Sequence, residues 1–174
     1  MRKTRFVAFA AVSALAAALG VAIASGATGS RNVQVLDDCD ATSFNAVIGP
    51  GTCVKDGGVT FSEFIDQLAT QGRAPAWRFS PGQLKLPAGG TLEAHNQGGE
   101  FHTFTEVAAF GGGCVDELNA ILGLTPVPEC AIPGIFGTTG IAPRGELDTA
   151  PLAAGTHRFM CLIHPWMKAT ATVG

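Results

Sequence analysis

A short segment near the carboxyl terminus brings together three side chains that can bind a metal. Cys161, His164 and Met167 follow one another at intervals of three residues. A thiolate and an imidazole bind several transition metals, whereas a thioether is a poor zinc ligand and suits an ion that cycles between Cu(II) and Cu(I). A trigonal blue-copper site needs two histidines, one cysteine and a weak axial methionine. The segment therefore predicts a copper site whose second histidine comes from elsewhere in the chain.

Short strands separated by glycine-rich turns must hold this segment in place. Apolar and polar residues alternate over several stretches, and turn residues such as Ala88-Gly89-Gly90 lie between them. The pattern predicts all-β structure arranged as a sandwich or a barrel. The expected strands are 77–86, 91–96, 101–107, 156–161 and 168–173.

We place the β domain at 73–174, because the residues before it and one stretch inside it lack this alternation. Residues 25–72 are predicted to form an amino-terminal extension with a short helix that Thr60 or Ser62 can cap. An insertion at about 108–140 interrupts the domain with glycines, prolines and a second short helical candidate. Loops of this length are usually functional, stabilised by their own contacts, or both.

The cysteine count predicts two disulfide bonds and one functional thiol. Five cysteines leave one over after pairing, and Cys161 in the metal-binding segment is the natural odd one. The other four permit three pairings. We favour Cys39 with Cys53 and Cys114 with Cys130, because each bridge then stays within one segment outside the sheets.

The first residues of the chain predict an exported protein. Arg2, Lys3 and Arg5 precede an apolar, alanine-rich run with small residues after it, so 1–24 is interpreted as a secretory signal peptide. An uncleaved anchor is the alternative, and the run is only marginally long enough to span a membrane. Without 1–24 the chain keeps 8 Lys and Arg against 14 Asp and Glu, a net charge of −6. We expect a periplasmic or secreted protein with no membrane span after cleavage and no affinity for nucleic acid.

The metal-binding segment resembles the copper loop of the cupredoxins, the type 1 blue-copper proteins. Its Cys-x-x-His-Pro-aromatic-Met spacing is similar to that of amicyanin, plastocyanin and pseudoazurin. Upstream, Phe79-Ser80-Pro81 and the strand that ends at Asn96 resemble the family's Phe-x-Pro, turn and strand. The resemblance covers 76–107 and 141–174. It implies a cupredoxin-like Greek-key β-sandwich, to which this chain adds the helical extension and the disulfide-stapled insertion.

The resemblance also implies a ligand set. His102 occupies the place of the family's first copper histidine. One type 1 copper would then be held by His102, Cys161 and His164, with Met167 as the weak axial ligand. His95 is the rival histidine on the preceding segment, and we expect it to be structural or exposed.

Three further residues near these ligands can be interpreted from their positions. Asn96 either hydrogen-bonds near the ligand loop and stabilises the thiolate, or is a plain turn residue. Trp166 is either a docking aromatic at the loop surface or part of the core. His157 lies roughly 13 Å along an extended strand from the Cys161 thiolate, too far away to share its metal.

This ligand set predicts a one-electron carrier and not an enzyme. The expected partners are redox proteins, cytochrome-like or copper oxidoreductases, which would exchange electrons at an exposed edge of His164. Copper buffering or delivery is the alternative, but labile Cu(I) carriers more often use exposed clusters of methionine and histidine. Multicopper oxidases place histidine beside the copper cysteine, whereas Met160 and Leu162 stand there in this chain. With 4 histidines in all, the chain has too few for a trinuclear copper centre.

Overall fold

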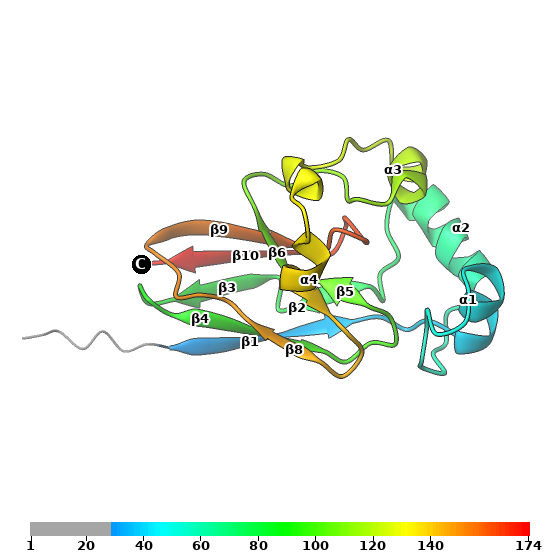
Figure 1. Cartoon of the computed structure of the whole chain (residues 1–174), viewed down its shortest axis with the longest axis horizontal. Coiled ribbons are helices and arrows are strands. Elements are labelled where there is room, and N and C mark those ends of the chain that lie inside the picture. Colours follow the sequence, from blue (N-terminus) through cyan, green and yellow to red (C-terminus); the bar gives the residue numbers. More distant parts are fainter. Residues whose placement is uncertain (1–28) are drawn as a thin grey trace, which may run out of the picture.

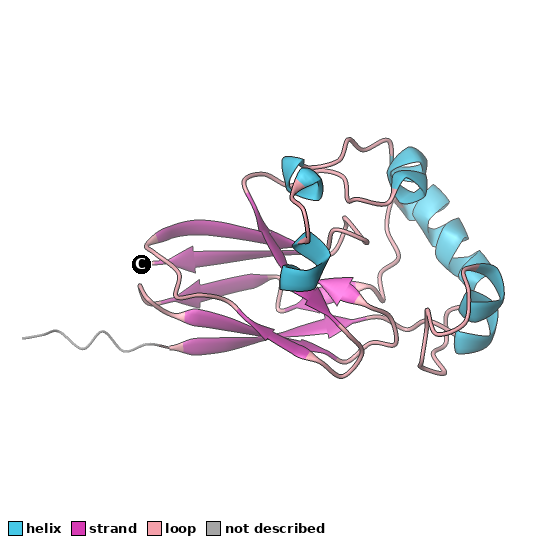
Figure 2. Cartoon of the chain, in the orientation of Figure 1, coloured by secondary structure: helices cyan, strands magenta, loops and turns pink. Residues whose placement is uncertain are grey.

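The computed structural model describes residues 29–174, in which strands form one end of the molecule and helices gather at the other (Figures 1 and 2). The predicted signal peptide, 1–24, lies outside the described residues. The strands are β1 (Ser30–Leu36), β2 (Arg78–Ser80), β3 (Gln83–Leu86), β4 (Thr91–Asn96), β5 (His102–Thr103), β6 (Thr105–Val107), β7 (Gly140–Ile141), β8 (Glu146–Asp148), β9 (Gly155–Met160) and β10 (Lys168–Val173). The helices are α1 (Ala41–Val47), α2 (Phe61–Gln71), α3 (Asp116–Leu122), the 3-10 turn η1 (Pro128–Ala131) and α4 (Ile135–Thr139).

Two four-stranded sheets form the cupredoxin-like β-sandwich that the sequence predicts. The first sheet has the order β2-β1-β4-β8, and the second has the order β3-β10-β9-β6. The strands β5 and β7 form a separate antiparallel pair. Within the sheets β1 runs parallel to β4 and β10 parallel to β3, so strands that are distant in sequence lie side by side.

The strand β1 lies within the segment predicted as an amino-terminal extension, yet it is an inner strand of the first sheet. It pairs with β2 on one side and with β4 on the other. Val33 and Val35 are fully buried and alternate with exposed neighbours such as Gln34. Two apolar residues are too few to show a strand by alternation alone, so its place depends on pairing with distant strands.

Aromatic side chains fill the space between the sheets. The rings of Phe104 and Phe159 stack with centroids 4.5 Å apart, and Phe79 meets Phe104 edge-on at 5.1 Å. All three residues are buried. Burying a phenylalanine side chain stabilises the folded protein by about 1.5–3 kcal/mol. This cluster therefore stabilises the sandwich that carries the loops at its end.

The helices α1, α2 and α3 form a cap over one end of the sandwich, whereas α4 lies alongside it (Figures 1 and 2). The helix α2 begins after Thr60, one of the two predicted caps, with a capping box between Thr60 and Glu63, and a left-handed Gly72 follows its last turn. The buried Phe44 of α1 and Phe64 of α2 pack against each other and against Trp77. None of the helices in residues 29–174 is both long enough and apolar enough to cross a membrane.

Both predicted disulfide bonds are confirmed. Cys39 is bonded to Cys53 beside α1, and Cys114 is bonded to Cys130 within the insertion. Cys161 is the free cysteine of the described residues, and it is buried. The two bridges therefore fasten the segments that build the helical cap and leave one thiol at the end of β9.

Candidate metal centre

The loop between β9 and β10 carries three of the predicted ligands and is closed by its own backbone. The amide of Cys161 donates to the carbonyl of Met167 at 3.1 Å, and the amide of Met167 donates to the carbonyl of His164 at 2.9 Å. The two strands are paired directly beside the loop, with Met160 opposite Lys168. The spacing of three residues thus becomes a tight turn that brings Cys161 and His164 together.

The structure places His102 against this loop, and three side-chain atoms form a triangle. The Sγ atom of Cys161 lies 3.8 Å from Nδ1 of His102 and 3.8 Å from Nδ1 of His164. The two Nδ1 atoms are 3.2 Å apart. The point equidistant from all three lies about 2.1 Å from each, close to metal–nitrogen and metal–sulfur bond lengths in proteins. The donor set and its geometry fit one transition-metal ion.

All four predicted ligand residues are shielded from solvent. His102, Cys161 and Met167 have no exposed surface, and His164 is 4% exposed. These four side chains suit copper better than they suit harder metals, since thiolate and thioether are soft donors. A prediction about His164 is wrong: its edge is not exposed, because Phe64, Trp77 and Trp166 surround the ring.

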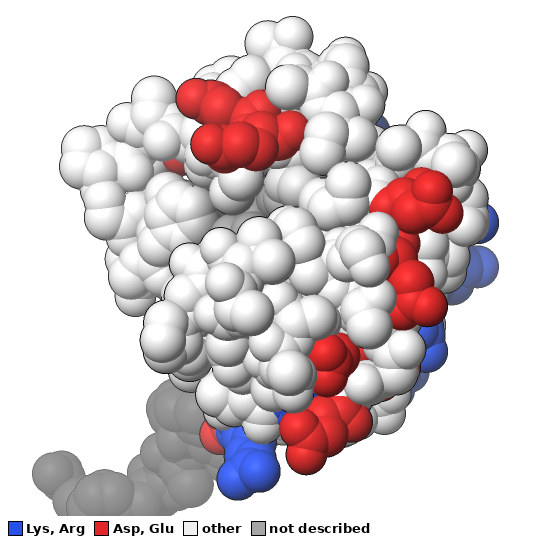
Figure 3. Space-filling model, turned by 90° about the vertical axis from the view of Figure 1, so that its right-hand side faces the viewer, with Lys and Arg blue, Asp and Glu red and all other residues white. Residues whose placement is uncertain are grey.

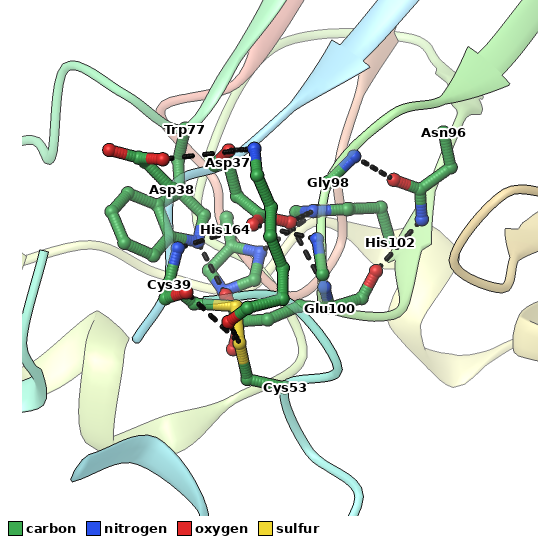
Figure 4. Close-up of polar contacts among 12 residues, drawn as sticks. Asp37, Asp38, Cys39, Cys53, Trp77, Asn96, Gly98, Glu100, His102 and His164 are labelled. Carbon is green, nitrogen blue, oxygen red and sulfur yellow. Dashed lines mark hydrogen bonds and ion pairs between the residues drawn. A yellow bond between two sulfur atoms is a disulfide. The ribbon is translucent and has the colours of Figure 1, made fainter. Parts of the chain in front are cut away.

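The outer nitrogen of His102 faces a buried carboxylate (Figure 4). Its Nε2 atom lies 2.8 Å from Oδ2 of Asp37, which directly follows β1. The same carboxylate accepts hydrogen bonds from the amides of Cys39, Gly99 and Glu100. An acceptor at Nε2 fixes the proton there and leaves Nδ1 free to bind a metal.

The outer nitrogen of His164 faces a second buried carboxylate. Oε2 of Glu100 lies 3.7 Å from Nε2 of His164 and accepts a hydrogen bond from Nε1 of Trp77 at 2.5 Å. Asp37 and Glu100 also lie near the sulfur of Cys39, but that sulfur is in a disulfide and offers no thiolate. The two carboxylates therefore act on the histidines rather than forming a second metal site.

The electrostatics of the triangle favour an ionised cysteine. Burial disfavours the thiolate, but hydrogen bonds and charge from His102 and His164 outweigh it and lower the pKa of Cys161 well below its usual value. Burial likewise disfavours the imidazolium, yet hydrogen bonds to Asp37 and Cys161 raise the pKa of His102 to about 9. Positive charge is therefore already favoured where a metal cation would bind.

The carboxylates behind the histidines respond to burial in opposite ways. Burial disfavours ionised Asp37, but its bonds from His102 and the backbone amides hold the pKa well below the usual range. For Glu100 burial dominates and raises the pKa, although the charge of His164 and the bond from Trp77 oppose it. The folded protein therefore favours the ionised form of Asp37 more strongly than that of Glu100.

Thr103 is a supporting residue that the sequence prediction missed. Its amide lies 3.4 Å from Sγ of Cys161, and its Oγ1 accepts a hydrogen bond from the amide of Leu162 at 2.7 Å. Asn96 makes no hydrogen bond to the thiolate and is more than a plain turn residue: its buried side chain accepts from the amide of Gly98 and donates to the carbonyls of Glu100 and of the distant Ile141. The only signal for Thr103 was its place directly after a candidate ligand.

The insertion also touches the ligand loop. The amide of Cys114 donates to the carbonyl of Leu162 at 2.5 Å. A Cβ atom on Gly113 would lie 2.3 Å from that carbonyl oxygen, so only glycine allows this approach. The insertion therefore packs directly against the ligand loop and helps to enclose the site.

The remaining candidates lie where their surroundings make them structural. His95 is partly exposed and lies beside Glu93 and Glu146, which confirms that it is away from the triangle. His157 contacts Glu106 and the carbonyl of Ala153. Trp166 is partly buried, and its indole donates to the carbonyl of Ala74, which favours packing over an exposed docking role.

Similar solved structures are cupredoxins, whereas no protein-family model and no curated protein sequence matches the chain. The purple cupredoxin from Nitrosopumilus maritimus is 16% identical, with 82% of this chain and 98% of that chain covered and a TM-score of 0.44. The plastocyanin from Dryopteris crassirhizoma is 16% identical, covering 83% of this chain and 100% of that chain with a TM-score of 0.41. A mutant of amicyanin in the Cu(I) form is 17% identical, covering 56% and 73% with a TM-score of 0.37. At such low identities and with TM-scores below 0.5, these likenesses carry no conclusion about this chain.

Proposed function

We propose that the protein holds one type 1 copper ion and serves as a one-electron carrier in an exported compartment. His102, Cys161 and His164 would be the strong ligands, and Met167 the weak axial one. The observation that carries the proposal is the buried triangle of two Nδ1 atoms and one Sγ atom. When bound, copper supplies a centre that takes up and gives back a single electron.

The surrounding residues suit a carrier because they hold the ligands in a fixed arrangement. The ligand loop is closed by its own hydrogen bonds, and Thr103 ties it to the strand that carries His102. Asp37 hydrogen-bonds to the outer nitrogen of His102, and the carboxylate of Glu100 lies 3.7 Å from that of His164. A site that is already assembled needs little rearrangement when its charge changes, and the buried ligands keep water away from it.

Redox proteins remain the proposed partners, and the helical cap is the end nearest the site. Figure 3 looks onto that end, where acidic side chains lie around a largely uncharged surface and basic ones appear near the margin. Exposed acids on α2 and α3 include Glu63, Asp66, Asp116 and Glu117. The insertion at 108–140 contains no Lys or Arg. Such a surface favours a partner with a basic face, cytochrome-like or a copper oxidoreductase.

Copper buffering or delivery is the less favoured function. A delivery protein must present its ligands to an acceptor, whereas the three strong ligands here are at most 4% exposed. The two disulfide bonds are compatible with an oxidising, exported compartment. The site offers no second cluster of ligands in residues 29–174 that could pass a metal onward, since the other group contains the bonded Cys39.

Reversible redox cycling and metal retention separate the two functions. Copper-loaded protein is cycled repeatedly between oxidant and reductant, and copper transfer to a competing chelator is followed in each state. A carrier cycles with one electron per chain and keeps its copper over many cycles. Rapid loss of Cu(I) to the chelator, on the time scale of cycling, would contradict the carrier and favour delivery.

A further inference from the structure

A large cavity opens beside the candidate metal centre, inside the helical cap. Its volume is about 740 Å³, within the range of about 300–1,000 Å³ typical of small-molecule sites. Its walls come from α1, α2, α3 and the ligand loop and are mainly apolar. They include Phe44, Phe61, Phe64, Phe101, Leu118 and Ile163.

The walls of this cavity are held in place by covalent bonds. Thr52, which lines the cavity, directly precedes Cys53, and Val115, which also lines it, directly follows Cys114. Each of these cysteines is in a disulfide. A cavity whose walls are already fixed loses little conformational entropy when a ligand enters, which favours binding.

Four polar side chains line the cavity among the apolar ones: Thr52, Glu100, Glu117 and His164. Glu100 is 5% exposed. Its Oε2 accepts the indole hydrogen of Trp77, but none of the described residues donates a hydrogen bond to its Oε1. A ligand that enters the cavity and brings a hydrogen-bond donor to this free carboxylate oxygen forms a charge-assisted hydrogen bond, which favours its binding.

We propose that this cavity binds a small, uncharged aromatic molecule that carries a hydroxyl donor, of the phenol class. Its ring would lie among the phenylalanine side chains, and its hydroxyl would donate to Oε1 of Glu100. Anions are excluded by the carboxylate and by the acidic residue Glu117 at the wall. The contacts that define the ligand involve no metal, so the inference goes beyond the proposed electron carrier and does not depend on it.

The test compares phenol with toluene on copper-free, disulfide-intact protein. The two molecules have nearly the same shape, but toluene has no donor and is the more hydrophobic. Binding is followed by NMR through the indole N–H of Trp77, which shares the carboxylate of Glu100. Two variants on α3 complete the test. Ile121→Glu places a charge on a residue that lines the cavity, and Ala120→Glu places the same charge on an exposed neighbouring residue that does not line the cavity.

Phenol should saturate one site and bind roughly tenfold more tightly than toluene, as a hydrogen bond to a buried carboxylate implies. Ile121→Glu should weaken the binding of phenol by roughly tenfold, since a charge then faces the apolar wall. Ala120→Glu should bind phenol as tightly as the unaltered protein does. Toluene binding as tightly as phenol, equal effects of the two variants, or no saturable binding would each overturn the proposal. Copper loading is measured separately by its absorption band, so a failure of this site is distinct from a failure of the proposed function.

Discussion

The carboxylate of Asp37 lies 2.8 Å from Nε2 of His102, although the two residues are 65 positions apart. Asp37 follows the amino-terminal strand β1, and three backbone amides also donate to it. The amino-terminal segment therefore supplies a strand to the sandwich and an anion to the back of a candidate copper ligand. This contact ties the function of the site to a part of the chain outside the recognisable copper motif.

Asp37→Asn should weaken copper binding and raise the reduction potential. An anion behind His102 favours Cu(II) over Cu(I), and loss of such an outer partner typically costs about 10–100-fold in metal affinity. Competition with a chelator gives the affinity, and a potentiometric titration gives the potential. Asp38→Asn is the matched control, because Asp38 is partly exposed and pairs with Lys55. Equal affinities and potentials for both variants would contradict the role given to Asp37.

Thr103→Val should destabilise the ligand loop. The substitution keeps the shape of the side chain but leaves the buried amide of Leu162 without its acceptor, which costs about 1–3 kcal/mol. The free energy of unfolding in urea measures the cost. Thr172→Val, at an exposed position of β10, should change it by no more than about 0.5 kcal/mol. A stability loss at Thr103 no larger than at Thr172 would show that this hydrogen bond is unimportant.

Phe64→Ala should open the candidate centre to solvent. Phe64 is 3% exposed and packs against Trp77 and His164, with ring centroids 4.7 Å and 6.2 Å away. Truncation should cost about 3–5 kcal/mol of stability and speed the transfer of copper to a chelator. Phe136→Ala, at an exposed position of α4, is the control and should leave the transfer rate unchanged. An unchanged rate in Phe64→Ala would mean that the cap does not protect the copper.

The pH dependence of stability should contain a contribution from His157. The carbonyl of Ala153 and the carboxylate of Glu106 raise the pKa of this histidine in the folded protein. Its stabilising effect is therefore fully present below the unfolded value of about 6.5 and is lost as the pH rises through the folded pKa. The difference in unfolding free energy between the unaltered protein and His157→Gln should shrink as the pH is raised. A difference that is constant or grows with pH would have the wrong sign.

How far the sequence predicts the site depends on whether the information is local. Cys161, His164 and Met167 lie within one turn, so their spacing alone indicates the metal, and the two disulfide bonds follow from short separations of 14 and 16 residues. The edge of His164 could not be predicted in the same way. Its burial depends on how α2 packs over the end of the sandwich, which helix periodicity does not reveal.

The outer contacts of the histidines were beyond prediction for a related reason. Asp37 and Glu100 look like ordinary acidic residues in the sequence, and their place behind the ligands arises from the pairing of β1 with β4 and from the turn after β4. A resemblance that covers 76–107 and 141–174 carries no information about Asp37. Long-range strand pairing, rather than local pattern, decides which charges meet the site.

The absorption spectrum of the copper-free protein titrated with Cu(II) tests the central claim most directly. The account predicts an intense charge-transfer band in the visible range that saturates at one copper per chain. The band should be lost in Cys161→Ser, lost or shifted in His102→Ala, and unchanged in His95→Gln, whose imidazole lies away from the triangle. A folded, disulfide-intact protein that shows no such band, or a band that survives Cys161→Ser, would contradict copper binding through this thiolate.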